Sequence, residues 1–78
     1  MKWLKNIKNI VQLNSPGNCP YCDNLNTEYT AVKVNKNWGY AVIWCNDCKR
    51  ACHLSRFEIT DKTVVGKVIP QNLNFTSN

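Results

Sequence analysis

Two short cysteine motifs decide the fold of this chain: CPYC at residues 19–22 and CNDC at residues 45–48. Residues 23–44, which lie between them, alternate and turn as a β-hairpin does, so the second motif should return beside the first. Each pair can reach one ion from a tight turn, and two pairs supply four soft sulfur ligands. The spacing therefore predicts one tetrahedral Zn²⁺ site with the ligands Cys19, Cys22, Cys45 and Cys48.

The first motif also has a redox interpretation. CPYC resembles the active-site motif of glutaredoxins, Ile10–Leu13 reads as the strand before it, and Val68–Gln71 resembles the Val-Pro turn of that family. In glutaredoxins a long helix follows the motif and lowers the pKa of the first thiol. Here residues 23–27 are typical of a turn and a β-rich run follows, while CNDC would have no role. This alternative is disfavoured, and we expect no thiol-disulfide activity.

The pattern of knuckle, hairpin, knuckle and strand over residues 18–59 resembles the zinc-ribbon superfamily, a knuckle being one C-x-x-C turn. The resemblance implies a zinc ribbon with a structural zinc; together with a short N-terminal helix read from the residues before it, the expected fold is a small α+β zinc ribbon with a three- to four-stranded antiparallel sheet. In zinc ribbons glycine often follows each knuckle, because the backbone there tends towards positive φ. This chain has Asp23 and Lys49 at those places, and aspartate tolerates positive φ better than lysine does.

Length and charge limit the class of protein. A chain of 78 residues makes one domain, and so short a chain buries too little apolar surface to be comfortably stable without a metal or disulfides. It has five cysteines, and we expect no signal peptide and no membrane span, so cytoplasmic localisation with reduced thiols is expected. The formal net charge is +5, which four thiolates and one Zn²⁺ would reduce to about +3.

Residues 1–14 are predicted to form an amphipathic helix. Trp3, Leu4, Ile7, Ile10 and Val11 fall on one helical face, while the lysines at positions 2, 5 and 8 fall largely elsewhere. This face is expected to cover the small sheet; a membrane-surface helix is the alternative. Pro16 and Gly17 make continuation of the helix unfavourable.

The rest of the chain reads as strands. Residues 27–35 and 38–44 form the hairpin, with Trp44 expected in the core. Residues 51–59 favour a third strand, although Cys48, Ala51, Cys52 and Ser55 also have helical spacing, which would give a treble-clef finger. An additional strand is expected within residues 60–70, weakened at Gly66, and residues 71–78 form a polar tail.

No catalytic group of residues is visible. Cys52 and His53 are adjacent, so on a strand their side chains would point to opposite faces, whereas a nucleophile needs a base within hydrogen-bond reach. Either residue could replace Cys48 as a ligand, but packing or solvent exposure is the expected role. Four thiolates also leave no open position on the metal. The protein is therefore expected not to be an enzyme, and no small-molecule substrate is expected.

Basic and aromatic residues interleave along the hairpin and after it, a pattern that suits single-stranded nucleic acid or RNA. Nucleic acid is therefore the first predicted partner. The alternative partner is a protein, anchored on the hairpin tip in the manner of an adaptor or inhibitor. The predicted binding residues are Lys33, Lys36, Trp38, Tyr40, Lys49, Arg50 and Arg56.

Overall fold

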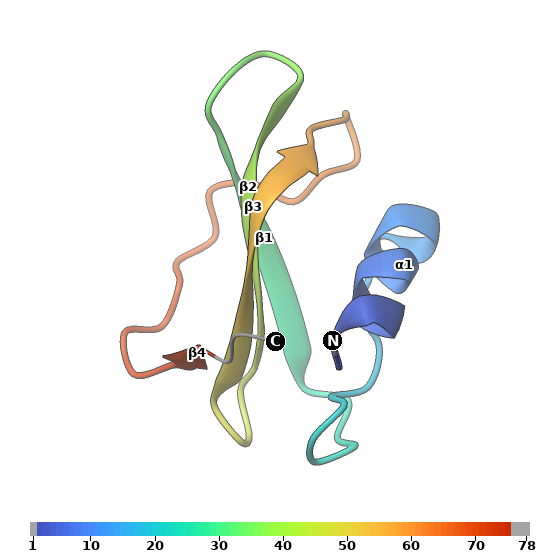
Figure 1. Ribbon diagram of the computed structural model, residues 1–78, viewed down its shortest axis with the longest axis vertical. Coiled ribbons are helices and arrows are strands. Elements are labelled where there is room, and N and C mark those ends of the chain that lie inside the picture. The colour runs from blue at the N-terminus through green and yellow to red at the C-terminus, as the bar shows by residue number, and fades with distance from the viewer. Residues whose placement is uncertain (1, 76–78) are drawn as a thin grey trace.

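β-branched and aromatic residues recur from Thr27 to Phe57, and they form a sheet that one short helix accompanies (Figure 1). The structure is a computed structural model that describes residues 2–75. In chain order the elements are α1 (Leu4–Leu13), β1 (Thr27–Lys33), β2 (Trp38–Cys45), β3 (Arg50–Glu58) and β4 (Asn74–Phe75).

The sheet has the strand order β1-β2-β3-β4. β1, β2 and β3 are antiparallel neighbours, whereas the short β4 runs parallel to β3. The predicted antiparallel sheet is therefore confirmed for β1, β2 and β3 but wrong for the fourth strand, which makes the sheet mixed. The chain reaches β4 through a long connection, residues 59–73, which we call the return segment, and not through a hairpin turn. As a result β4 can join the edge of the sheet in the same direction as β3.

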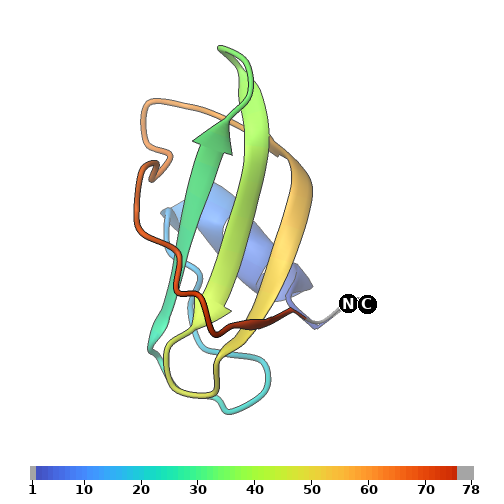
Figure 2. The same cartoon turned by 90° about the vertical axis from the view of Figure 1, so that its left-hand side faces the viewer.

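The two faces of the sheet carry separate apolar clusters. Tyr29, Ile43 and Cys52 face α1, where they pack with Trp3 and Ile10. The opposite face carries Val42, Trp44 and Ala51, against which Ile69 and Leu73 pack from the return segment. Figure 2 shows this segment crossing in front of the sheet, with α1 behind it. Trp44 is 1% exposed, which confirms its predicted place in the core.

The pairing of β2 with β3 shifts its register between Gly39 and Ala41. As a result Leu54 and Phe57, three residues apart on β3, both pack against the cluster that faces α1. The glycine at this point is required by the hairpin, because a Cβ atom on Gly39 would collide with the carbonyl oxygen of Val32.

The predicted N-terminal helix is present as α1. It ends where Asn14 takes a left-handed conformation (φ 58°) and its N–H donates to the carbonyl of Ile10. Asn6 is buried in the helix, and its Nδ2 donates to the carbonyls of Pro16 (2.9 Å) and Asn18 (2.7 Å). The helix is thereby tied to the loop that leads into the first knuckle.

Three predictions about the second half of the chain have clear outcomes. Residues 50–58 form β3, so the strand interpretation is confirmed and the helical, treble-clef alternative is wrong. The expected strand within residues 60–70 is absent from the described chain except for one parallel bridge between Val65 and Ala31. Gly66 adopts φ 77° directly after that bridge and interrupts the extended backbone. The last strand, β4, lies instead in the predicted polar tail, of which residues 76–78 lie outside the described chain.

Within residues 2–75, no helix combines the length and the apolar character that crossing a membrane requires.

Candidate metal centre

The four paired cysteines meet at one end of the sheet. Their Sγ atoms all lie within 4.8 Å of one another, with 3.5 Å between Cys19 and Cys48 and 3.6 Å between Cys22 and Cys45. Zinc–sulfur bonds of about 2.3 Å in a tetrahedron place neighbouring sulfurs about 3.8 Å apart. The cluster therefore has the size of a four-thiolate metal site, and the predicted gathering of these cysteines is confirmed.

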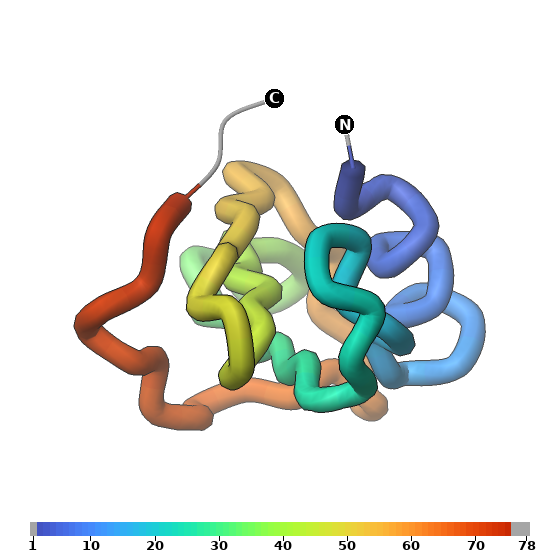
Figure 3. Tube along the Cα trace, turned by 90° about the horizontal axis from the view of Figure 1, so that it is seen from below, coloured from blue at the N-terminus to red at the C-terminus, as the bar shows by residue number. Residues whose placement is uncertain are grey.

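The hairpin brings the knuckles together, as the sequence spacing predicted. Thr27 at the start of β1 lies opposite Cys45 at the end of β2, so both knuckles are at the same end of the sheet. Hydrogen bonds join the loops: the N–H of Asn46 (2.8 Å) and its Nδ2 (3.3 Å) both donate to the carbonyl of Asn26, and Asn26 Nδ2 donates to Asp47 Oδ1 (3.1 Å). Seen from below, the two loops lie next to each other (Figure 3).

The two knuckles have nearly the same backbone. Asp23 follows the first with φ 62°, and Lys49 follows the second with φ 63°. The N–H of Asp23 donates to the carbonyl of Cys19 (2.9 Å), and that of Lys49 to the carbonyl of Cys45 (3.0 Å). The positive φ expected at both places is thus confirmed, including at the lysine, where it is costly.

Backbone N–H groups point at the sulfurs in the same pattern in both knuckles. The first cysteine of each receives N–H groups from the residues two and three positions on, and the second from the residue two positions on. Such bonds stabilise thiolates and lower their pKa. The donors are Tyr21, Cys22 and Asn24 in the first knuckle, and Asp47, Cys48 and Arg50 in the second.

Burial opposes these bonds. Burial raises the pKa of the Cys19 and Cys48 thiols, and the N–H groups offset only part of the effect. At Cys45 burial also raises the pKa, but the N–H groups of Cys48 and Asp47 and the neighbouring thiols lower it by more. The net shift of the Cys45 pKa is therefore downward. A cation is therefore needed to hold all four groups as thiolates at neutral pH, and its binding would release protons.

Cys52 and His53 lie outside the sulfur cluster. Cys52 is 3% exposed in the core under α1, and burial alone raises its pKa. His53 is exposed on the opposite face, where its ring lies 5.3 Å from that of Tyr40. The geometry gives neither residue a place among the four sulfurs, as the sequence predicted.

Basic residues surround the first knuckle. The Lys2 Nζ atom lies 5.0 Å from the centre of the Tyr21 ring, and the Arg50 guanidinium lies 4.5 Å from it. Trp3 packs against the same ring at 6.1 Å. Both cations therefore lie over Tyr21, a residue of the first knuckle, where they would offset part of the negative charge of four thiolates around a divalent ion.

The seven predicted binding residues do not form one surface. Lys49 and Arg50 lie at the metal end, whereas Lys33, Lys36 and Trp38 lie at the hairpin tip, the length of β2 away. Lys33 lies on the opposite face of the sheet from Tyr40, because Val32 is the residue that pairs with Tyr40 and side chains alternate along a strand.

At the tip the structure assembles a smaller surface, which we call the tip platform: Trp38, Tyr40, His53 and Arg56. The Arg56 guanidinium lies 4.8 Å from the Trp38 ring centre, and the His53 ring lies beside Tyr40. Trp38 and Tyr40 are half-buried, and Val32 beside them is 36% exposed. The sequence prediction missed His53 as a member of this surface. Because His53 lies two residues after Ala51 on β3, the two side chains share the face of the sheet that carries Val42 and Trp44, and this spacing was visible in the sequence.

Comparison with known proteins adds no relative: no family model matches the chain, and neither a curated protein nor a solved structure matches it. The likeness to zinc ribbons therefore depends on the residues and geometry of this chain.

Proposed function

We propose that the four thiolates hold one structural Zn²⁺ ion and that the stapled domain is a binding module, not an enzyme. The observation that carries this proposal is the cluster of four sulfurs on two knuckles of matching backbone geometry. Four cysteines form a closed shell, which is typical of structural zinc. Cys52, the remaining cysteine, is buried on the face opposite to His53, so the pair is unsuited to nucleophilic catalysis.

The identity of the metal can be tested directly. A tetrahedral set of four sulfurs accepts zinc or iron. We expect purified protein to contain one zinc per chain by native mass spectrometry and elemental analysis, and to be colourless. A stoichiometric iron content with visible thiolate-to-iron absorption would identify the metal as iron and not zinc. Full folding of the protein in the presence of a chelator would show that the metal has no structural role.

For the binding partner we propose single-stranded nucleic acid or RNA, held at the tip platform. Trp38 and Tyr40 are two residues apart on β2, which places their Cα atoms about 7 Å apart and their side chains on one face of the sheet. Aromatic rings on an exposed sheet stack on successive bases without strong sequence preference. Arg56 lies on the platform and Lys36 is exposed in the hairpin turn, so both can reach phosphates.

Fluorescence anisotropy with a labelled ten-nucleotide oligo(dT) or oligo(U) strand tests this partner. Two phosphate contacts give a slope of log K against log salt of about −1.4, so binding should be micromolar or weaker at physiological salt. Trp38→Ala should cost about 1–3 kcal/mol and leave the slope nearly unchanged. Lys36→Ala should flatten the slope.

Lys5→Ala is the matched control, since it removes the same charge from α1, away from the tip platform. Equal effects of the two lysine variants would show that only net charge matters. Flat titrations at low salt with zinc-loaded protein would exclude nucleic acid.

A protein partner is the second candidate, because apolar side chains stand beside the tip platform: Val34 is 60% exposed and Val32 is 36% exposed. An aromatic anchor with apolar neighbours is typical of protein interfaces. This candidate predicts no nucleic-acid binding and a defined protein complex that Trp38→Ala abolishes. A cytoplasmic location remains a prediction for either partner.

A further inference from the structure

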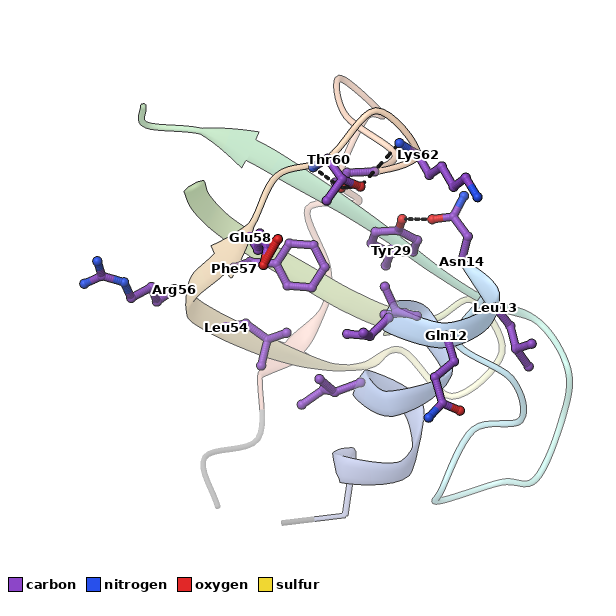
Figure 4. Close-up of a pocket in the computed structure, with 14 residues that line it drawn as sticks. Gln12, Leu13, Asn14, Tyr29, Leu54, Arg56, Phe57, Glu58, Thr60 and Lys62 are labelled. Carbon is purple, nitrogen blue, oxygen red and sulfur yellow. Dashed lines mark hydrogen bonds between the residues drawn. The ribbon is translucent and has the colours of Figure 1, made fainter. Parts of the chain in front are cut away.

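A groove of about 530 Å³ lies between α1 and the far half of β3 (Figure 4). It is on the face of the sheet opposite to the tip platform, and no cysteine of the metal cluster lines it. The volume is within the range of pockets that hold small molecules, about 300–1,000 Å³. This groove between α1 and β3, which we call the α1 groove, has no role in the function proposed above.

Apolar and aromatic side chains form the inside of the α1 groove. Ile7 and Ile10 line it from α1, and Leu54 and Phe57 line it from β3. The Tyr29 ring lies 6.2 Å from Phe57 and closes one end. The register shift in β3 creates this wall, because it turns both Leu54 and Phe57 towards α1.

Hydrogen bonds fix a polar corner at the Tyr29 end. The Tyr29 hydroxyl donates to Asn14 Oδ1 and accepts from the N–H of Val64 (3.1 Å). Because Asn14 uses its oxygen in this bond, its Nδ2 group is available to donate to a ligand. The loop above is closed by Thr60 N–H to Thr63 Oγ1 (2.9 Å) and by Thr63 N–H to the Thr60 carbonyl (3.1 Å).

This loop carries Lys62, which lines the groove and makes no ion pair within residues 2–75. Two other charged residues line the groove. The guanidinium of Arg56 lies over Trp38, and Glu58 is drawn beside Phe57, away from Asn14 and Lys62 (Figure 4). The corner formed by Asn14 and Lys62 therefore presents hydrogen-bond donors and one positive charge.

We propose that the α1 groove binds a small amphipathic carboxylate. Its apolar chain lies against Ile7, Leu54 and Phe57, and its carboxylate accepts hydrogen bonds from Lys62 Nζ and Asn14 Nδ2. A cation of the same chain length is disfavoured, because at this corner its head group would meet the positive charge of Lys62 and the donor group of Asn14. Arg56 lines the α1 groove and also belongs to the tip platform, but the Asn14 and Lys62 corner that holds the carboxylate contains no residue of the tip platform.

Alkanoates of increasing length provide the test, each used below its micellar concentration with the zinc-loaded full chain. Calorimetric titration of octanoate, decanoate and dodecanoate should give 1:1 binding that tightens about fourfold per methylene, the value expected for burial of a CH₂ group, until the groove is full. Dodecyltrimethylammonium, with the same tail, should bind more weakly. Chemical shifts should change at Tyr29, Leu54 and Phe57 but not at Trp38.

Variants of the groove distinguish the contribution of the apolar tail to affinity from that of the carboxylate. Lys62→Gln should weaken dodecanoate about two- to fivefold, as an exposed charge pair allows, and Glu58→Gln should leave it equal or tighter. Lys36→Gln is the matched control, because it removes the same charge at the hairpin tip and should leave affinity unchanged. Leu54→Trp should abolish binding by filling the groove; its zinc content and circular dichroism show whether it is folded.

Several results would overturn the proposal. Equal binding of anionic and cationic amphiphiles, or an affinity that ignores chain length, would show nonspecific adsorption. Binding to vesicles of phosphatidylcholine with phosphatidylglycerol, without binding of monomeric alkanoates, would identify α1 as a membrane-surface helix.

Discussion

The two knuckles have nearly the same backbone but different supports. Each turns with positive φ at the residue after its second cysteine, and each closes with one N–H···O=C bond of 2.9 or 3.0 Å. The first is held through Asn6, a buried residue of α1. The second is held through its own Asn46, which accepts from Trp44 Nε1 (3.0 Å) and donates to Glu28 (2.7 Å). The shape of each knuckle is thus encoded locally, whereas the first is supported by a residue of α1 and the second by bonds that its own Asn46 makes to Trp44 and Glu28.

The largest effect is expected from substitution of a cysteine ligand, and it should be the same in the two knuckles. Cys22→Ser and Cys48→Ser should each lose the metal and unfold the domain, because structural zinc contributes about 10–16 kcal/mol and a typical domain is stable by only about 5–15 kcal/mol. Zinc content and circular dichroism measure the outcome. Cys52→Ser is the control, since Cys52 lies outside the cluster, and it should keep its zinc. Retention of zinc by either ligand variant would refute the four-cysteine site.

Substituting Asn6 and Asn46 in turn should show how much each contributes to the free energy of unfolding. Asn6→Ala removes a buried side-chain donor from the carbonyls of Pro16 and Asn18, of which Pro16 keeps a longer bond from Asn9 Nδ2 (3.3 Å), and should cost about 1–3 kcal/mol. Asn46→Ala should cost less, because Asn46 is only half-buried and its side-chain bond to the Asn26 carbonyl is exposed, so water can reach the groups that lose their partner. Urea unfolding of zinc-saturated protein gives both values. Asn72→Ala, at an exposed position, is the control with no expected change. An equal cost for both variants would mean that the supports do not differ.

A smaller effect should distinguish Asp23 from Lys49. Both have positive φ, a conformation that costs an ordinary side chain about 1–2 kcal/mol, and glycine removes this cost but raises the entropy of the unfolded chain. Lys49→Gly should therefore stabilise by about 0.5–1 kcal/mol. Asp23→Gly should be nearly neutral, since aspartate tolerates this region better. Thermal unfolding with excess zinc measures both, and destabilisation by Lys49→Gly would show that the lysine side chain has a role of its own.

The smallest effect concerns Glu28, which links the second knuckle to the return segment. Hydrogen bonds from Lys67 and Asn46 lower the pKa of this carboxyl group. The charged pair therefore stabilises the fold at pH values above the unfolded pKa of about 4.3, and this contribution disappears as the pH falls through the lower folded value. Because the Lys67 and Glu28 side chains are 42% and 37% exposed, the contribution should stay below about 0.5 kcal/mol.

Carboxyl NMR titration of zinc-loaded protein tests this assignment. The pKa of Glu28 should lie below its ordinary value, and Lys67→Met should raise it. If Lys67→Met leaves the titration of Glu28 unchanged, Asn46 alone accounts for the shift, and the return segment has no electrostatic link to β1.

The sequence by itself determined the metal end. The cysteine spacing and the hairpin between the pairs are short-range signals, which is why the gathering of the four cysteines could be predicted, and the resemblance to zinc ribbons implied the positive φ at Asp23 and Lys49. The amphipathic pattern of α1 and the alternation in β2 are likewise local signals. They predicted the helix and the buried Trp44.

Only the tertiary structure decided where the remaining side chains meet. The register shift between β2 and β3 changes which residues of β3 share a face, and one such shift turns Leu54 and Phe57 towards α1. The predicted strand within residues 60–70 does not form: the chain pairs with the sheet only at Val65 and then in β4. Gly66 interrupts the extended backbone after Val65, and Ile69 and Leu73 then pack on the apolar face of the sheet. Such outcomes depend on contacts between residues far apart in the chain, whose energies no local pattern specifies. For the same reason the seven predicted binding residues were divided between the two ends of the sheet, while the tip platform and the α1 groove arose only on folding.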